Sequence, residues 1–206
     1  DNTIGFENTG SGYKALAAKT TGNWNSAIGR QALLTNTLGT SNTALGAYAL
    51  NLNTTAGQNV AIGVNALRLQ NYGNGGVQWS TGNTAVGVDA LYSNQPTNAT
   101  NGLNNTAVGH SAMRANTTGW DNTGIGVSAL YSNTTGIENT AIGRQAMFSN
   151  TGGSTNTAIG YKSLRTNSSG LNNTANGAYA LYSNTGGSVN TALGYSSLYG
   201  NTTGSY

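Results

Sequence analysis

Cysteine is absent from the chain, proline occurs once, and charged residues make up only 6% of the 206 positions. Without cysteine, neither a disulfide framework nor a thiolate metal site can form. The eight basic and five acidic residues give a net charge of +3 and are scattered, with no run of Lys and Arg. A basic stripe of the kind that binds nucleic acid is therefore not expected, and no nucleic-acid partner is predicted.

Long hydrophobic runs are also missing from the sequence. No apolar stretch approaches the roughly 18 residues that a membrane-spanning helix needs, so membrane insertion is not predicted. No secretory signal peptide is found, and the chain begins with Asp1 rather than Met. We interpret this start as that of a processed or excised segment of a longer protein, an interpretation that leaves secretion open.

Asparagine, glycine and threonine are abundant and together approach half of the chain. They recur in a unit typified by Asn-Thr-Ala-Ile-Gly at 139–143. The unit occurs eleven times and ends at Gly12, Gly29, Gly46, Gly63, Gly87, Gly109, Gly126, Gly143, Gly160, Gly177 and Gly194. Most of these glycines lie seventeen residues apart, and such a period is typical of a solenoid whose coils bury apolar side chains against their neighbours. A disordered tract would have no reason to keep its aliphatic residues in phase.

The positions within the repeat indicate how each coil is built. The fourth residue before each repeat glycine is always Asn, and the fourth residue after it is always Leu or Met. Thr, Ala and an aliphatic residue usually precede the glycine, which favours a short strand. The Ala-Leu half is interpreted as a second strand, with a single helical turn as the alternative for stretches such as 177–184. We therefore predict an all-β parallel β-solenoid (β-roll) of about eleven 17-residue coils, stacked at about 4.8 Å per rung, with the Asn residues forming an amide ladder.

The two apolar pairs of each coil bear on the assembly of the chain. Neighbouring residues of a strand point to opposite faces, so Ala141 and Ile142 are not expected to share one interior, and neither are Ala146 and Met147. We expect the Ala residues inside a narrow coil. This leaves an Ile/Leu/Val column and a Leu/Met column in need of cover, and a homotrimer about the rod axis would supply it.

The chain is predicted to form one repeat domain over 1–206. It comprises a partial coil at 1–7, regular coils at 8–66, two coils with insertions at 67–104, and regular coils at 105–204. The insertions produce loops at 71–80 and 95–102, on adjacent coils, and insertions in repeat proteins often map to the binding face. The candidate ligand-binding residues in these loops are Tyr72, Gln78, Trp79, Asn98 and Asn101. An alternative for Trp79 is that its ring merely covers the flank of the coil.

Other candidate sites are weaker. The fifth position after the repeat glycine forms a column in which Arg and aromatic rings would stack, either as a subunit interface or as a surface for sugar rings. Its members are Arg68, Tyr92, Arg114, Tyr131, Phe148, Arg165, Tyr182 and Tyr199. The only histidine, His110, has Asp89 one coil away but no nucleophile, so no enzyme activity is predicted. No cofactor and no metal site are predicted either.

The alternation of Asn-Thr-Ala-Ile-Gly, Ala-Leu and Asn-Thr-Thr-Gly resembles repeats of tail-fibre-like proteins of phages and of Bacteroidetes-type bacteria. It is also similar, with a longer period, to the head repeats of trimeric autotransporter adhesins. The resemblance covers 2–204 and lies in the repeat consensus rather than in any site. It implies an extracellular, trimeric β-solenoid on a cell or virion surface.

These observations favour a non-enzymatic structural and adhesive segment of a surface fibre or tail fibre, with glycan or host-receptor binding at the loops. The alternative is an ice-binding solenoid, because columns of Thr at rung spacing can match a lattice. Against it, each Thr follows Asn rather than forming two same-face Thr columns, and Arg, Tyr and the insertions would roughen the surface. A soluble lectin is a third hypothesis.

Overall fold

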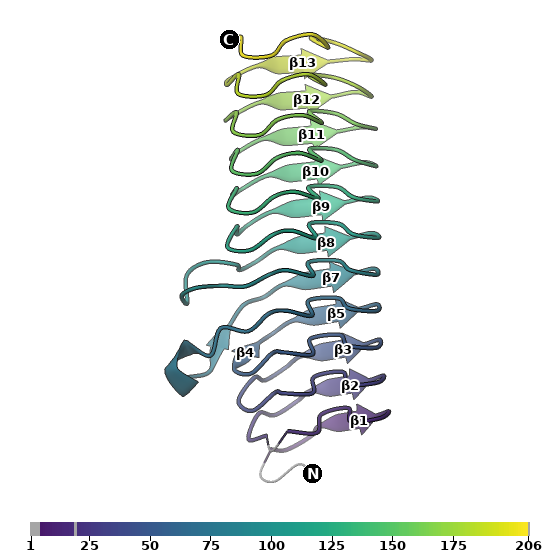
Figure 1. Cartoon of the computed structure of the whole chain (residues 1–206), viewed down its shortest axis with the longest axis vertical. Helices are drawn as coiled ribbons and strands as arrows, with labels where there is room; N and C mark the ends of the chain where they lie inside the picture. The colour runs from purple at the N-terminus through teal and green to yellow at the C-terminus, as the bar shows by residue number, and fades with distance from the viewer. Residues whose placement is uncertain (1–4, 19, 206) are drawn as a thin grey trace.

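The structure, a computed structural model, describes residues 5–18 and 20–205. The partial coil predicted at 1–7 therefore lies partly outside the described residues. The chain winds into a rod of stacked coils, with its ends at opposite ends of the rod (Figure 1). Each coil contributes one three-residue strand. These strands are β1 (Thr9–Ser11), β2 (Ser26–Ile28), β3 (Thr43–Leu45), β5 (Val60–Ile62), β7 (Thr84–Val86), β8 (Thr106–Val108), β9 (Thr123–Ile125), β10 (Thr140–Ile142), β11 (Thr157–Ile159), β12 (Thr174–Asn176) and β13 (Thr191–Leu193).

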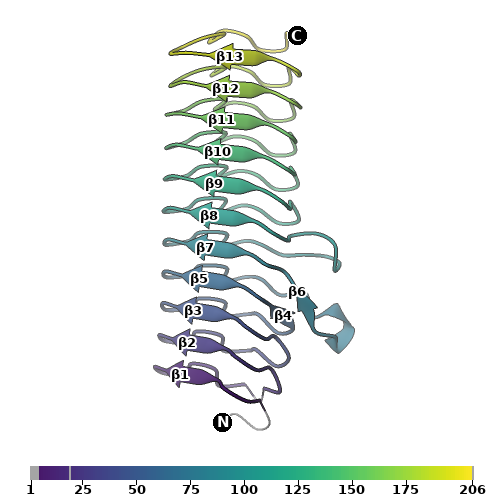
Figure 2. The same ribbon diagram turned by 180° about the vertical axis from the view of Figure 1, so that it is seen from behind.

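The strands form one eleven-stranded parallel sheet that runs the length of the rod (Figures 1 and 2). Equivalent residues of successive repeats pair directly, as Thr140 does with Thr157 and Ala141 with Ala158. The strand that follows each insertion stays in register, since Ala61 pairs with Ala85 and Ala85 with Ala107. The parallel β-solenoid predicted from the repeat is confirmed.

The Ala-Leu half of the coil is neither the predicted second strand nor the alternative helical turn. It is a run of turns in which the second and fourth residues after the repeat glycine have positive φ, as at Gln145 (58°) and Met147 (47°). The backbone N–H of Gln145 donates to Val127 of the preceding coil, whereas that of Met147 donates to Ser163 of the following coil. The hydrogen bonds therefore still link coils, but they alternate in direction along the chain.

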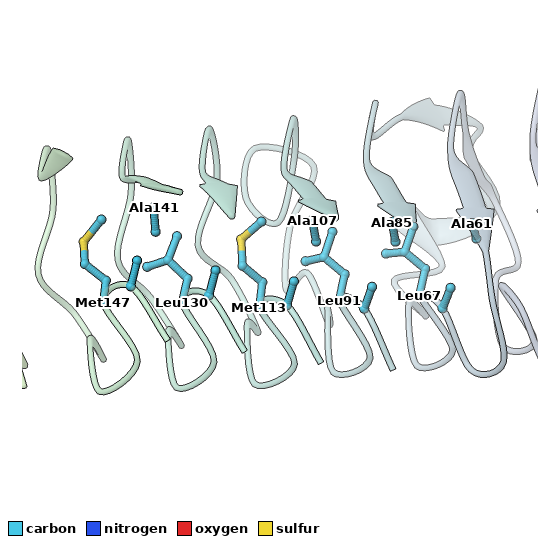
Figure 3. Close-up of a cluster of buried hydrophobic side chains, with 14 of the residues drawn as sticks. Ala61, Leu67, Ala85, Leu91, Ala107, Met113, Leu130, Ala141 and Met147 are labelled. Carbon is cyan, nitrogen blue, oxygen red and sulfur yellow. The ribbon is translucent and has the colours of Figure 1, made fainter. Parts of the chain in front are cut away.

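This backbone corrects the prediction for the core. Ala146 and Met147 are both fully buried, because a left-handed residue breaks the two-face alternation of a strand. The Leu/Met column needs no cover from another chain, contrary to the expectation. Figure 3 shows Leu67, Leu91, Met113, Leu130 and Met147 in a row inside the coils, facing the buried alanines of the sheet. The outward position of the Ile column was predicted correctly, and Ile142 is 38% exposed.

The predicted amide ladder is present. Oδ1 of Asn122 accepts hydrogen bonds from the backbone N–H and from Nδ2 of Asn139, and Asn139 Nδ2 also donates to the carbonyl oxygen of Gly153. A second ladder follows the seventh position after the glycine, where Asn150 Nδ2 donates to Asn133 Oδ1 at 2.9 Å. Both columns are buried. Polar side chains thus fill the interior at the corner where aliphatic side chains are missing.

The two insertions leave the rod at the same corner (Figures 1 and 2). The first contains a short 3-10 helix, η1 (Asn74–Gly76), and ends in β6 (Trp79–Ser80). Strand β6 pairs in parallel with β4 (Ala56–Gly57) of the preceding coil. The second insertion contains no strand or helix within the described residues.

Candidate functional site

The first inserted loop positions three of the residues predicted to bind a ligand. The Trp79 ring is only 8% exposed, and it meets the Tyr72 ring edge to face with centroids 5.5 Å apart. Its indole Nε1 is buried and has no hydrogen-bond partner among the described residues. Gln78 is exposed and donates through Nε2 to Thr40 Oγ1. The burial of Trp79 therefore agrees with the alternative that its ring covers the flank of the coil. Of these three side chains, Gln78 is the one exposed to a ligand.

The second loop uses its candidate amides to hold its own shape. Asn98 Oδ1 accepts hydrogen bonds from the backbone N–H and the hydroxyl of Thr100, both at 2.8 Å. Asn101 Oδ1 accepts from the Thr97 N–H at 3.0 Å, and its Nδ2 donates to Thr97 Oγ1. Pro96 is buried. The loop is thus ordered before any ligand arrives, and the two asparagines lie on the coil next to the one that carries Gln78.

A ladder of aromatic and Arg side chains extends along the turn side of the rod. The Arg30 guanidinium carbon lies 5.9 Å from the Tyr13 ring and 5.7 Å from the Tyr48 ring. Arg68 follows, 5.0 Å from Tyr48 and 5.9 Å from Tyr92. Arg114 lies 4.9 Å from Tyr92, so the Tyr92 ring is between Arg68 and Arg114. These separations fall within the roughly 6 Å range of cation–π attraction.

The ladder continues to the last coil. The Tyr131 and Phe148 rings stack with centroids 5.1 Å apart, and those of Tyr182 and Tyr199 with centroids 5.0 Å apart. Arg165 lies between the two stacks, 5.1 Å from Phe148 and 5.8 Å from Tyr182. The predicted stacking at the fifth position is confirmed. We define the cation ladder as Tyr13, Arg30, Tyr48, Arg68, Tyr92, Arg114, Tyr131, Phe148, Arg165, Tyr182 and Tyr199, one residue on each coil.

Sequence analysis missed the first part of this ladder because it followed one position only. On the first three coils the ladder uses the first or second residue after the repeat glycine, at Tyr13, Arg30 and Tyr48. All three positions project from the same turns, so their side chains meet across coils. Reading the three columns together, rather than separately, would have shown the alternation of aromatic and basic residues.

Charge is separated between the two corners of the coil. Every Lys and Arg in the described residues is at the first, second or fifth position after the repeat glycine. Among the described acids, Glu7, Asp121 and Glu138 precede the strand instead, five residues before the glycine, and only Asp89 lies on the cationic side. Asp89 accepts a hydrogen bond from Arg114 Nε at 3.4 Å and another from Asn65. The cationic side therefore keeps an excess of positive charge.

Several groups on this side have shifted pKa values, among them Tyr161, Lys162 and Arg114. Contact with the Lys162 ammonium lowers the pKa of the Tyr161 phenol, and the same contact raises the pKa of Lys162. Burial lowers the pKa of Arg114, but its hydrogen bond to Asp89 and the charge of that group outweigh burial, so the pKa is raised. His110 is exposed, and Asp89 bonds to Asn65 and Arg114 rather than to it. Asp89 and His110 therefore do not form the acid–base pair that was considered from the sequence.

The outer face of the sheet is uncharged along all eleven strands. The outward positions of a strand are its first and third residues, which are Thr140 and Ile142 in β10. Stacking therefore produces a Thr column beside an aliphatic column. Exposed aliphatic side chains on this face include Ile28, Leu45, Ile125, Ile142, Ile159 and Leu193. Asn176 of β12 interrupts the aliphatic column.

Comparisons with protein-family models, curated proteins and solved structures give no match for this chain. Across residues 5–18 and 20–205, no helix has the length and apolarity required to span a membrane. In the same part of the chain, no three His, Cys, Asp or Glu side chains gather as metal ligands would. The candidate surfaces are thus the loop pair, the cation ladder and the uncharged sheet face.

Proposed function

We propose that this chain is a structural and adhesive segment of an extracellular fibre, on a cell surface or a virion. The observation that carries the proposal is the uncharged outer face of the eleven-stranded sheet, where an aliphatic residue stands in the third strand position from β2 to β11, exposed on β2, β3, β9, β10 and β11 and half-buried on β5, β7 and β8. Soluble monomers rarely expose large contiguous apolar surface. A rod with one such face and polar corners is suited to lie against other rods.

A homotrimer is the assembly that we propose for this face. Three rods related by a three-fold axis along their length would each turn the sheet face inward, so that the Ile142 columns meet at the centre. The Thr column beside them would lie at the edge of the contact, where its hydroxyls keep access to water. Asn176 would bring three amides together at one level, where they can hydrogen-bond to each other or to water.

The loop pair would then remain on the outside of the assembly, since it projects from a corner rather than from the sheet face. We propose that it is the receptor contact and that surface glycans are its ligands. Gln78 supplies an exposed amide, and the ordered second loop presents Asn98 and Asn101 without a large entropic cost on binding.

A glycan array probed with the intact protein and with Gln78→Ala tests this role. Gln58→Ala is the matched control, because Gln58 is also exposed but lies outside both loops. The proposal expects specific glycans to be bound, with binding reduced in Gln78→Ala and kept in Gln58→Ala. Equal binding by all three proteins would rule out the loop pair as the receptor site.

Ice binding is a second candidate, and one observation favours it. The strands pair in register, and the outer face of the sheet carries Thr in first position on nine of the eleven strands, at about 4.8 Å spacing. The other column on this face is aliphatic rather than Thr. Thermal hysteresis of a micromolar solution would support this function, whereas ice growth unchanged by the protein would dismiss it.

A further inference from the structure

We propose that the cation ladder binds an acidic linear polysaccharide, laid along the rod axis and held through its carboxylate or sulfate groups. This site is separate from the loop pair and does not depend on it. The ladder reaches from the first coil to the last, and its cationic members are Arg30, Arg68, Arg114 and Arg165. A second row of cations flanks it, with Lys14, Arg144 and Lys162 at the first or second position after the glycine.

The spacing of the cations selects a regular polymer. Arg30, Arg68 and Arg114 lie on the second, fourth and sixth coils, so at about 4.8 Å per rung these three cations recur about every 9.6 Å. Arg165, the fourth cation of the ladder, lies on the ninth coil, and Arg144 of the flanking row lies between Arg114 and Arg165, on the eighth. The spacing of the first three cations is close to the length of a disaccharide in an extended chain. A polysaccharide with one acidic group in every two sugars would therefore match successive cations without bending.

Arg30 and Arg144 carry the most available guanidinium groups for such a ligand, whereas Arg68 Nη1 donates to Tyr92 Oη and Arg114 Nε donates to Asp89. No side-chain hydrogen bond from Arg30, Arg144 or Arg165 to another described residue is present, and Arg30 and Arg144 are exposed. Arg30 and Tyr13 also line an open hollow of about 350 Å³ at the first coils. The arginines stack on the neighbouring rings, and this contact reduces the rotamer entropy that they lose on binding. Guanidinium groups bind carboxylate and sulfate through paired hydrogen bonds.

The same stacking disfavours a nucleic acid as the ligand. Proteins that bind single strands stack bases on open aromatic faces. In the ladder these faces are covered, since Tyr48 lies between Arg30 and Arg68, and Tyr92 lies between Arg68 and Arg114. Both rings are half-buried, and the Tyr92 hydroxyl accepts a hydrogen bond from Arg68 Nη1. The ladder therefore offers guanidinium charge rather than open ring faces, which suits a polymer with regularly spaced acids better than it suits bases.

Calorimetric titration with four probes tests the proposal: hyaluronate, which has one carboxylate in every two sugars, dextran sulfate, neutral dextran and oligo-dT. We expect one or both acidic polysaccharides to bind more tightly than oligo-dT, and neutral dextran not to bind. In Arg30→Gln/Arg68→Gln, affinity should fall about tenfold or more, because each lost guanidinium removes a charge-assisted hydrogen bond. The preferred acid distinguishes carboxylate from sulfate as the recognised group.

The matched control is Gln58→Glu/Asn172→Asp. It lowers the net charge by the same two units, but both exposed residues lie five positions before the glycine, at the other corner of the coil. Its affinity should change less than threefold, a change of about 0.65 kcal/mol at most. If circular dichroism shows that Arg68→Gln perturbs folding, Arg30→Gln/Arg144→Gln replaces it as the test variant, because it removes two exposed cations. Equal losses in the ladder and control variants, equal binding of neutral dextran, or tighter binding of oligo-dT would each overturn the proposal.

Discussion

At the residue scale, the most informative position is the fourth after the repeat glycine. It holds only Leu or Met, whereas the third strand position accepts Ile, Val and Leu. The reason is conformational: Leu130 has φ of 50° and Met147 of 47°, in the left-handed region that β-branched residues avoid. The restriction to unbranched Cβ atoms is visible in the sequence, and the left-handed backbone supplies its physical reason.

Leu130→Ile tests this account against Leu130→Met. Both keep an aliphatic volume close to that of Leu, and Met occupies the same position at Met113 and Met147. We expect Leu130→Met to lower the free energy of unfolding by less than about 1.5 kcal/mol. Leu130→Ile should cost about 1–3 kcal/mol more, because its branched Cβ is strained at positive φ. Urea unfolding followed by circular dichroism would measure both, and equal costs would contradict the account.

The buried amide ladder leads to a second prediction at the residue scale. Asn139→Ala removes a donor to the Gly153 carbonyl oxygen and the acceptor of the Asn156 N–H. Because each unpaired buried group costs about 1–3 kcal/mol, the variant should lose about 2–6 kcal/mol of stability. Thr140→Ala is the control, because Thr140 is the next residue along the chain and faces outward. This variant should change the free energy of unfolding by less than about 1 kcal/mol. If thermal denaturation finds the two variants equally stable, the ladder does not stabilise the coil.

At the scale of the element, the repeat glycine sets how closely two coils approach. Gly143 has φ of 133°, and a Cβ added there would lie 2.5 Å from the carbonyl oxygen of Gly160 in the next coil. The recurrence of glycine at this position was evident from the sequence. The sequence did not predict this backbone contact, which depends on the neighbouring repeat. The two requirements together explain why glycine fills the position in every repeat.

Gly143→Ala should therefore destabilise the rod by more than about 3 kcal/mol, through strain at positive φ and the clash between coils. Gly186→Ala is the matched control. Gly186 is exposed, lacks positive φ, and its added Cβ would meet only Ser169 Oγ at 3.6 Å. That variant should be neutral or more stable by up to about 1 kcal/mol. Soluble Gly143→Ala protein with an unchanged denaturation midpoint would refute this explanation of the corner.

Half of the coil could be predicted from sequence and half could not, for a physical reason. The Thr-Ala-Ile segment obeys the two-residue alternation of strands, so its inward Ala and outward Ile followed from pattern alone. The Ala146-Met147 segment breaks this alternation through left-handed residues that are not glycine. Neither Gln145 nor Met147 is a glycine or asparagine, the residues that usually indicate a left-handed conformation. Their conformation is imposed instead by hydrogen bonds to the coils on either side.

At the scale of the whole molecule, the rod has sides of different character. The sheet face is uncharged, one corner carries the acids, and the turn side carries the cations and stacked rings. The loop pair could be located from sequence because insertions interrupt a fixed period. The burial of Trp79 could not, since it depends on pairing between β4 and β6. The charge separation was also hidden, because residues seventeen apart become neighbours only when the coil closes.

If the uncharged sheet face is buried between three chains, as we propose, the folded protein has a fixed mass in solution. Multi-angle light scattering over a range of concentrations measures this mass, and we expect a constant value near three times the 20.9 kDa of one chain. A constant mass of one chain at every concentration would contradict the proposed trimer, because the aliphatic column of the sheet would then face water in the stable protein.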